Sequence, residues 1–164
     1  LDTQLLYGDN FKLIKKYNGW QKIRINKDGY IGYIKNEKFP KPIQSNFKVS
    51  VLKARLFRSP NSKNKLKKFL PYESRLKITK KKAAFAKFEN YWIKFSDIKK
   101  NNFKHNNIFK DIKLFKNIKY LWGGKSYKGI DCSALVQIFF NQNKSPPQPK
   151  PKIRSSSASA NSQK

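Results

Sequence analysis

Closely spaced turn signals constrain the fold of this chain more than any other feature of its sequence. Asn18-Gly19 and Asp28-Gly29 each separate short runs that are rich in apolar, β-branched and aromatic residues. These dipeptides favour the positive φ angles of tight hairpins, and the flanking runs favour strands. The three expected strands cover residues 11–14, 20–25 and 30–34. Strands so short and so close together predict a small antiparallel barrel over residues 1–45.

A second segment, residues 46–100, repeats this pattern after a linker that Pro40 and Pro42 stiffen. A turn is expected at residues 59–62, and a closing hairpin is expected around Glu89-Asn90. The expected strands, all rich in apolar residues, cover residues 49–57, 75–79, 84–88 and 91–95. The sequence thus predicts a second small barrel and a mostly β fold.

The apolar period changes to that of a helix in residues 101–143. Ile108, Ile112 and Phe115 predict a short amphipathic helix. A second helix is expected to begin at Cys132, with Asp131 as its N-cap. An apolar stripe at helical spacing follows the cysteine and consists of Leu135, Val136, Phe139 and Phe140. The remaining residues, 144–164, are rich in Pro, Ser and Ala, and they predict a disordered tail.

The charge of the chain is strongly positive, with 38 Lys and Arg against 9 Asp and Glu and a net charge of +29. Only five of the basic residues are Arg, which binds phosphate with a two-pronged geometry that Lys lacks. The lysines are spread along the chain among abundant Asn, Ile and Phe, so a general compositional bias explains them. The alternative is attraction to polyanions, either nucleic acid or anionic wall polymers.

Several other classes of protein are disfavoured by the composition. Cys132 is the only cysteine, so an internal disulfide is excluded. No apolar run has the 18 or more residues that a membrane span needs, and Leu1-Asp2 does not begin a signal peptide. No metal or cofactor is expected.

Cys132 is the residue with the clearest chemical potential. At a helix N-terminus, the helix dipole and the free backbone N–H groups favour thiolate, which is the nucleophilic form. A backbone N–H in the same turn is also placed to stabilise an oxyanion. The alternative from spacing alone is that Cys132 is a small buried apolar residue.

The residues around Cys132 favour the nucleophile. Tyr120-Leu121-Trp122-Gly123-Gly124, followed by Gly129-Ile130-Asp131-Cys132-Ser133, resembles the nucleophile motif of the NlpC family of papain-like cell-wall peptidases. The resemblance implies a hydrolase, a thiol protease, whose α+β catalytic domain begins in residues 101–143. It also implies that Trp122, Asp131 and Ser133 contact the substrate. Ala134 stands where family members often have Gly.

The N-terminal residues resemble a bacterial SH3-like domain of a subfamily with two such domains before the peptidase. The similarity lies in Thr3–Asp9 and in Asp28-Gly29-Tyr30-Ile31-Gly32-Tyr33. That subfamily cleaves the γ-D-glutamyl-diamino-acid bond of peptidoglycan stem peptides. The resemblance implies that Asp9, with Tyr33 or Tyr30, binds the free amine of L-alanine in such peptides or muropeptides.

The catalytic base is the part of this resemblance that the chain does not supply. The histidine and the third polar residue of the family follow the cysteine by several tens of residues, whereas His105, the single histidine, precedes it. The chain is therefore expected to be truncated and inactive by itself. A non-catalytic muropeptide-binding module is the alternative, and polyanion binding is a second one. Muropeptide recycling favours the cytoplasm, whereas wall remodelling requires an upstream export signal.

Overall fold

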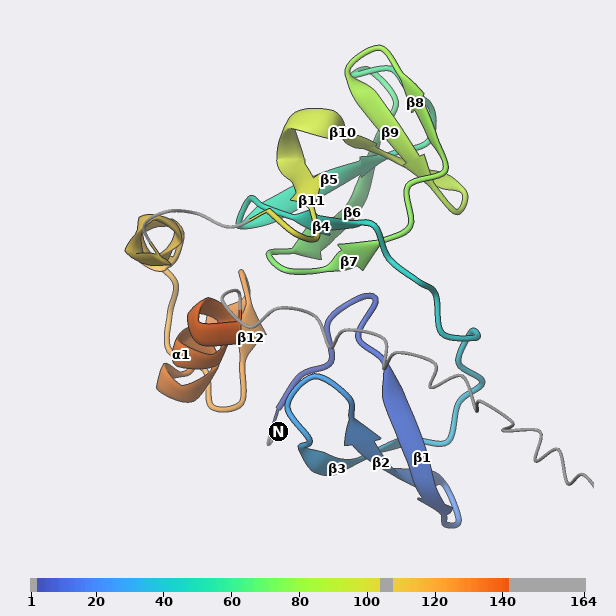
Figure 1. Ribbon diagram of the computed structural model, residues 1–164, viewed down its shortest axis with the longest axis vertical. Helices are drawn as coiled ribbons and strands as arrows, with labels where there is room; N and C mark the ends of the chain where they lie inside the picture. Colours follow the sequence, from blue (N-terminus) through green and yellow to red (C-terminus); the bar gives the residue numbers. More distant parts are fainter. Residues whose placement is uncertain (1–2, 104–107, 142–164) are drawn as a thin grey trace, which may run out of the picture.

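Two β-rich regions and a short helical segment make up the described part of the chain, residues 3–103 and 108–141 (Figure 1). In this computed structural model the two β regions lie at opposite ends of the molecule, and the helical segment lies beside both. The predicted fold class is confirmed: the described residues are mostly β, in small sheets, with a short helical segment after them. Within the described residues, no helix is long and apolar enough to cross a membrane.

The first β region, residues 3–45, contains a three-stranded antiparallel sheet. Its strands, in spatial order, are β1 (Phe11–Lys16), β2 (Trp20–Ile25) and β3 (Ile31–Lys35). Gly19 and Gly29 have φ angles of 76° and 75° in the two connecting turns, a conformation that costs glycine little. The Asn-Gly and Asp-Gly hairpins predicted from the sequence are therefore confirmed.

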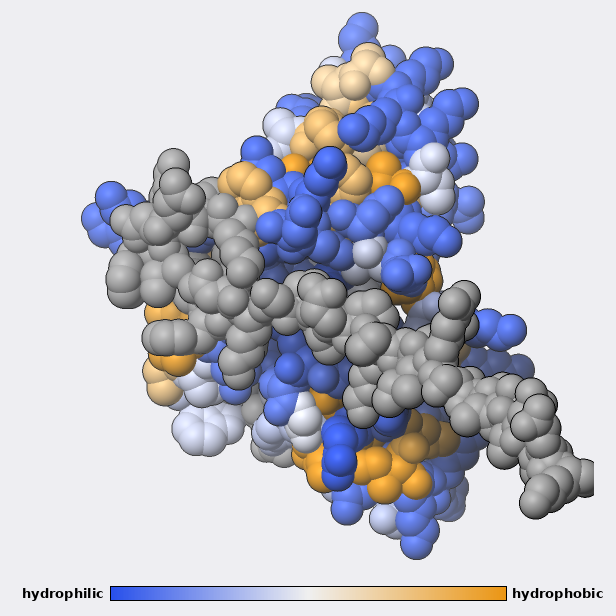
Figure 2. All heavy atoms as spheres, viewed as in Figure 1, coloured by the Kyte–Doolittle hydropathy of each residue, from blue (hydrophilic) through white to orange (hydrophobic). Residues whose placement is uncertain are grey.

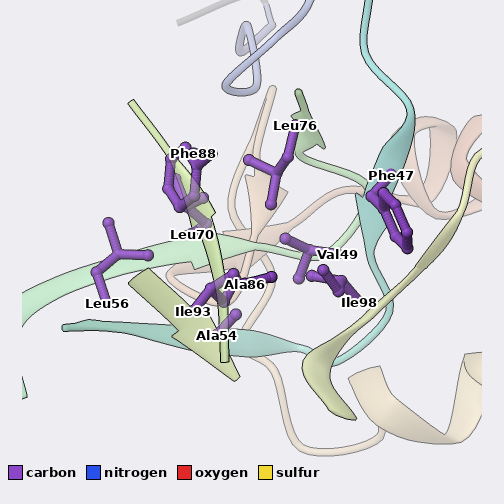
Figure 3. Close-up of a cluster of buried hydrophobic side chains, with 10 residues drawn as sticks. All are labelled: Phe47, Val49, Ala54, Leu56, Leu70, Leu76, Ala86, Phe88, Ile93 and Ile98. Carbon is purple, nitrogen blue, oxygen red and sulfur yellow. The ribbon is translucent and has the colours of Figure 1, made fainter. Parts of the chain in front are cut away.

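The second β region, residues 46–100, contains two antiparallel sheets that enclose one apolar core. The five-stranded sheet has the order β6 (Lys65–Pro71), β5 (Lys53–Phe57), β10 (Tyr91–Lys94), β9 (Phe85–Phe88) and β8 (Lys80–Lys82). The smaller sheet has the order β11 (Ile98–Lys100), β4 (Phe47–Val49) and β7 (Arg75–Leu76). A short 3₁₀ helix, η1 (Phe95–Asp97), connects β10 to β11. Val49, Leu76 and Ile93 are fully buried where the side chains of both sheets meet (Figure 3).

Two of the strands predicted in this region need correction, and a further strand was missed. The run predicted as one strand, residues 49–57, is divided between β4 and β5, which belong to different sheets. Residues 50–52 bend between them, and the Ser50 N–H donates to the Asp97 carbonyl. An apolar run does not reveal a strand that changes sheet at a corner. The strand predicted at residues 75–79 is limited to β7, and the lysine-rich strand β6 was not predicted.

The helical segment follows the second β region. It contains the 3₁₀ helix η2 (Ile108–Phe115), the two-stranded hairpin β12 (Lys125–Ser126) and β13 (Gly129–Ile130), and the helix α1 (Cys132–Asn141). Both predicted helices are present, although the first has 3₁₀ geometry. The residues between the glycine-rich motif and Cys132, for which no strand was predicted, form the β12–β13 hairpin.

The helical segment packs on the second β region through a small core of its own. Tyr72, Phe115, Ile130, Ala134 and Ile138 are its buried members. The Tyr72 hydroxyl donates a buried hydrogen bond of 2.8 Å to Asp111 Oδ2, which fastens η2 to the end of β6.

The apolar stripe predicted for α1 is wrong in part. Ala134 and Ile138 are buried and Leu135 packs against them, whereas Val136 is 55% exposed. Val136 and Cys132 are spaced by one helical turn and are both exposed. The side chains of Phe139 and Phe140 lie outside the described part of the structure, as does the predicted tail, residues 144–164.

Candidate active site

Cys132 is the first residue of α1 and its side chain is exposed. The preceding residue, Asp131, caps the helix as predicted. Its Oδ1 accepts hydrogen bonds from the Ala134 N–H, at 2.5 Å, and from the Ser133 hydroxyl, at 2.9 Å. The cysteine is therefore presented to solvent from a helix terminus that its neighbour holds in place. The reading of Cys132 as a buried apolar residue is excluded by its exposure.

The other oxygen of Asp131 reaches across to the glycine-rich loop. Its Oδ2 accepts a 2.9 Å hydrogen bond from the Gly123 N–H, and the Asp131 N–H donates to the Gly124 carbonyl. Burial alone would raise the pKa of Asp131. The hydrogen bonds from Ala134, Ser133 and Gly123 outweigh burial, so the pKa of this carboxyl lies below its ordinary value.

Three glycines of the motif allow this close packing. Gly123 has a φ angle of 67°, which favours glycine over any residue with a Cβ. A Cβ on Gly124 would lie 2.6 Å from the Gly129 carbonyl oxygen. A Cβ on Gly129 would lie 2.3 Å from the Leu121 Cβ. The spacing of the motif thus has a steric cause, because the loop and the β12–β13 hairpin touch at glycine backbones.

Two aromatic residues of the same loop project into solvent. Trp122 is 69% exposed and Tyr120 is 63% exposed. The Gly123 bond to Asp131 holds the residue next to Trp122 against the start of α1. Trp122, Asp131, Cys132 and Ser133 therefore lie together around one helix terminus.

A cavity of about 480 Å³ lies between the first β region and the β12–β13 hairpin. Tyr30 and Tyr33 line it from the first region, and Ser126–Lys128 line it from the hairpin. Two polar contacts join its walls: the Lys125 N–H donates to Gln4 Oε1 at 2.8 Å, and Lys125 Nζ lies 3.4 Å from Asp28 Oδ2. The hairpin that leads into Cys132 is thus fastened to the N-terminal region.

Asp9 does not share this cavity with the two tyrosines. It lines a second, mainly apolar cavity of about 460 Å³, together with Phe11, Phe39, Phe88 and Glu89. Asp9 Oδ2 accepts a 2.9 Å hydrogen bond from the Leu6 N–H and so closes its own turn. The structure therefore separates the predicted trio: Tyr30 and Tyr33 lie together, and Asp9 lies on the other side of the segment Leu5–Tyr7, which lines both cavities.

Two titratable groups near this second cavity have shifted pKa values. Burial raises the pKa of the Asp9 carboxyl, and the Leu6 hydrogen bond with the charges of Lys27, Lys125 and Arg75 offsets only part of this effect. Burial and a hydrogen bond to Glu89 raise the pKa of Tyr7. Both groups thus favour their protonated forms more than free side chains do.

Sequence reasoning missed Gln4, Ser126 and Tyr127 as residues that line the cavity between the first β region and the β12–β13 hairpin. Their proximity depends on the contact of two segments more than 100 residues apart, for which no local pattern exists. The described residues contain no histidine, because His105 lies outside them. Nor do they contain a group of three or more His, Cys, Asp or Glu placed to hold a metal ion.

Comparison with known proteins agrees with this geometry. Residues 1–39 match the model of the bacterial dipeptidyl-peptidase SH3 domain, and residues 117–161 match the model of the NlpC/P60 family. No curated protein matches the chain. The structure is similar to the crystal structure of an NlpC/P60 family protein from Bacillus cereus ATCC 10987, with a TM-score of 0.69 and 20% identity. The match covers 86% of this chain and 54% of that one, so the chain spans about half the length of that protein.

The family match around Cys132 suggests a peptidase of the cell-wall class. The two matches agree with the family predicted from the sequence: residues 117–161 are similar to the NlpC/P60 family, and residues 1–39 are similar to a bacterial SH3 domain. Membership of this family suggests a cysteine peptidase.

Proposed function

We propose that the chain is the N-terminal part of a cysteine endopeptidase that hydrolyses the γ-D-glutamyl-diamino-acid bond of peptidoglycan stem peptides. In this proposal residues 1–45 and 46–100 are two SH3-like domains, and residues 101–143 begin the catalytic domain. The observation that carries the proposal is the exposure of Cys132 at the start of α1, where the hydrogen bonds of Asp131 to Gly123 and Ala134 hold the helix terminus in place.

The proposed chemistry is nucleophilic attack on the carbonyl carbon of the γ-D-glutamyl bond. The Cys132 Sγ forms a thioester as the amine of the diamino acid leaves, and water then hydrolyses that thioester. An imidazole must take the thiol proton and return it to the leaving nitrogen. The single histidine of the sequence, His105, precedes Cys132, whereas the base of the family follows it. We therefore propose that these 164 residues alone do not hydrolyse the peptide.

Two features of the site support an assignment of roles. Both oxygens of Asp131 accept hydrogen bonds from the chain itself, so Asp131 is proposed to position the nucleophile turn. The exposed Trp122 and the cavity beside Tyr30 and Tyr33 are proposed to receive the peptide. Since Asp9 is turned to the other cavity, the two tyrosines are better placed than Asp9 to meet the L-alanine end.

The test compares this chain with a chimera that continues after residue 141 with the histidine-bearing part of a relative. Cleavage of L-alanyl-γ-D-glutamyl-diamino-acid peptides is expected from the chimera only, and Cys132→Ala is expected to abolish it. Loss of such a group removes several orders of magnitude in rate. A folded chimera without activity contradicts the assignment of Cys132. Cleavage by the short chain contradicts its proposed inactivity.

A non-catalytic muropeptide-binding module is the second candidate, and the cavity lined by Tyr30 and Tyr33 favours it. Calorimetry with the uncleaved peptide separates the two functions. Binding by the short chain that Tyr33→Ala weakens, and that Tyr91→Ala on the distant β10 does not, would support recognition without catalysis. If only the chimera binds, recognition requires the completed catalytic domain.

Reactivity of the thiol provides a test that needs no histidine. Because Cys132 is exposed at a helix N-terminus, iodoacetamide is expected to modify it in the native chain faster than it modifies glutathione. The rate is measured by mass spectrometry at neutral pH. A rate no higher than that of glutathione would remove the argument that the helix activates the thiol.

A further inference from the structure

The positive charge is concentrated in one of the two β regions. Residues 46–100 contain 17 Lys or Arg and 3 Asp or Glu, whereas residues 1–45 contain 9 and 4. A compositional bias of the whole chain would affect both regions alike. The excess in the second region therefore requires an explanation of its own.

The three acidic residues of that region do not neutralise its five-stranded sheet. Glu73 is buried, with Lys48 Nζ at 2.9 Å and Lys27 Nζ at 3.7 Å from its carboxylate. Glu89 lies in the turn between β9 and β10, and Asp97 lies in η1. Strands β5, β6, β8, β9 and β10 themselves contain no acidic residue.

The strand register places the lysines together on the outer face of this sheet. One row of directly paired residues crosses all five strands and consists of Lys80, Lys87, Trp92, Phe57 and Lys65. A second row, two residues along, consists of Lys82, Phe85 and Lys94. Directly paired residues share a face, and the alternate residues, Ala86 and Ile93 among them, point into the core. We call these eight residues the lysine face.

The centre of the lysine face is apolar and its edges are charged. Phe57, Phe85 and Trp92 form a buried cluster, with the Phe57 and Phe85 ring centres 5.1 Å apart. The lysines of the face other than Lys87, which is half-buried, are exposed. Figure 2 shows hydrophilic side chains along the rim of the molecule beside β8 and β9. Lysine stems can cover aromatic rings while their ammonium groups stay in water.

This arrangement has a cost for the fold. Lys80 and Lys87 are directly opposite each other, and like charges in such pairs destabilise a sheet. None of the five strands offers a carboxylate that would relieve the repulsion. A bound polyanion would relieve it, and binding would release condensed counterions.

We propose that the lysine face binds a linear polyol-phosphate polymer, an anionic chain of phosphodiesters without bases. The phosphates contact exposed ammonium groups, which act as point charges. The choice of a wall polymer as the source of this chemistry rests on the proposed cell-wall function. The binding itself does not involve Cys132.

Two observations favour this polymer over a nucleic acid. The rings of the lysine face are buried, with Phe57 at 1% and Trp92 at 9% exposure, so no base can stack on them. The only Arg in these five strands, Arg55, lies 4.4 Å from the Phe69 ring centre and donates to the Leu66 carbonyl, so its guanidinium is engaged within the chain. The face offers charge but no means of reading bases.

The test is a salt titration of binding to poly(glycerol phosphate) with the full 164-residue chain. A variant of the lysine face carries Lys65→Gln, Lys80→Gln, Lys82→Gln and Lys94→Gln. A control with the same loss of charge in the first β region carries Lys12→Gln, Lys16→Gln, Lys35→Gln and Lys38→Gln. Each lost phosphate contact is expected to reduce the slope of log K against log salt by about 0.7. The variant of the lysine face, which loses four lysines, is therefore expected to flatten this slope by about 3. The control is expected to change it by less than about 1.

The outcomes that overturn the proposal are distinct from those of the peptidase test. Equal flattening by both variants would assign binding to diffuse charge. Tighter binding of single-stranded DNA with the same number of phosphates would assign the face to nucleic acid instead. If circular dichroism shows that the fourfold variant is unfolded, the double variant Lys80→Gln with Lys82→Gln replaces it. The double variant is expected to flatten the salt slope by half as much. An unchanged salt slope in the double variant would overturn the proposal. Cys132→Ala serves as a control that leaves polymer binding unchanged, whatever the peptidase assay gives.

Discussion

The two β regions contain similar short strands, yet they are stabilised in different ways. The second region encloses ten buried apolar residues between two sheets. In the first region, β1 has no buried residue, and Ile23 and Ile25 of β2 are the buried apolar residues of its sheet. Figure 2 shows an apolar patch over the strands of the first region, whereas hydrophilic side chains dominate around β8 and β9 of the second.

The difference indicates that the first region depends on its neighbours. Its N-terminal segment bonds to the second region through the Tyr7 carbonyl and the Arg75 N–H, and to the hairpin through Gln4 and Lys125. A three-stranded sheet with so few buried residues has only marginal stability by itself. The second region thus acts as a scaffold, and the first region completes a cavity with the hairpin that precedes Cys132.

A matched pair of core truncations tests this comparison with the largest expected effect. Ile93→Ala removes a side chain with 0% exposure from the centre of the second region. Its cost in unfolding free energy is expected near the upper end of about 2–5 kcal/mol. Ile23→Ala, at 1% exposure in the first region, is expected near the lower end, because Ile23 already borders the 480 Å³ cavity.

Denaturant unfolding followed by tryptophan fluorescence measures both costs. The fluorescence follows both β regions, because Trp92 lies in the second region and Trp20 in the first. Equal costs for the two variants would contradict the view that the second region holds the more continuous core.

The second prediction concerns the attachment of the helical segment to the scaffold. Tyr72→Phe keeps the ring packed against Phe115, at 5.7 Å between centres, but removes the hydrogen bond to Asp111. Loss of this buried bond is expected to cost about 1–3 kcal/mol. Amide hydrogen exchange is expected to rise in η2 and α1 and to stay unchanged in β2.

Tyr91→Phe is the control, since Tyr91 bonds to Lys68 at an exposed position. Its effect on exchange in α1 is expected to be negligible. If Tyr72→Phe leaves α1 unchanged as well, the helical segment does not depend on the second β region for its order.

The third prediction concerns the cap of α1. Asp131→Ala is expected to cost about 0.5–2 kcal/mol and to free the glycine loop, whereas Asp131→Asn keeps an N-cap and loses less. The folded pKa of Asp131 is lowered, so its contribution is present above the unfolded pKa and is lost as the pH falls through the folded value. A helix stability that stays constant under acid titration in the parent chain, or that Asp131→Ala leaves unchanged, would contradict this role.

The sequence predicted the elements that local chemistry determines. The turns at Gly19 and Gly29 require positive φ, and the cap at Asp131 needs only the four successive residues 131–134. The division of residues 49–57 between two sheets was not predictable, because Ser50, Val51 and Leu52 resemble any strand interior. Strand β6 was missed since its lysines, Lys65, Lys67 and Lys68, lack the alternation of a half-buried strand.

The candidate site also has one part that local sequence determines and another that depends on tertiary contacts. The cluster around Cys132 was predictable because Trp122 to Ser133 are close in the chain and fixed by glycine contacts. The cavity shared by Tyr33 and Ser126 depends on tertiary contact, so no spacing could reveal it. Asp9 was expected with the tyrosines because of the resemblance to the SH3-like domain, and the path of residues 5–7 separates them.

The smallest expected effect concerns Asp9 and the interface between the two β regions. Burial raises its folded pKa, so the protonated carboxyl contributes stability at a pH below the unfolded pKa, and this contribution is lost as the pH rises through the folded value. Asp9→Asn keeps an acceptor for the Leu6 N–H and removes the buried charge. We therefore expect a gain of no more than a few tenths of a kcal/mol at neutral pH and none at low pH, measured by thermal unfolding at both. Asp28→Asn, which faces Lys125 at 3.4 Å, is the control and is expected to give no gain at neutral pH. A clear loss of stability in Asp9→Asn at neutral pH would mean that the charge of Asp9, and not its hydrogen bond, fastens the first region to the second.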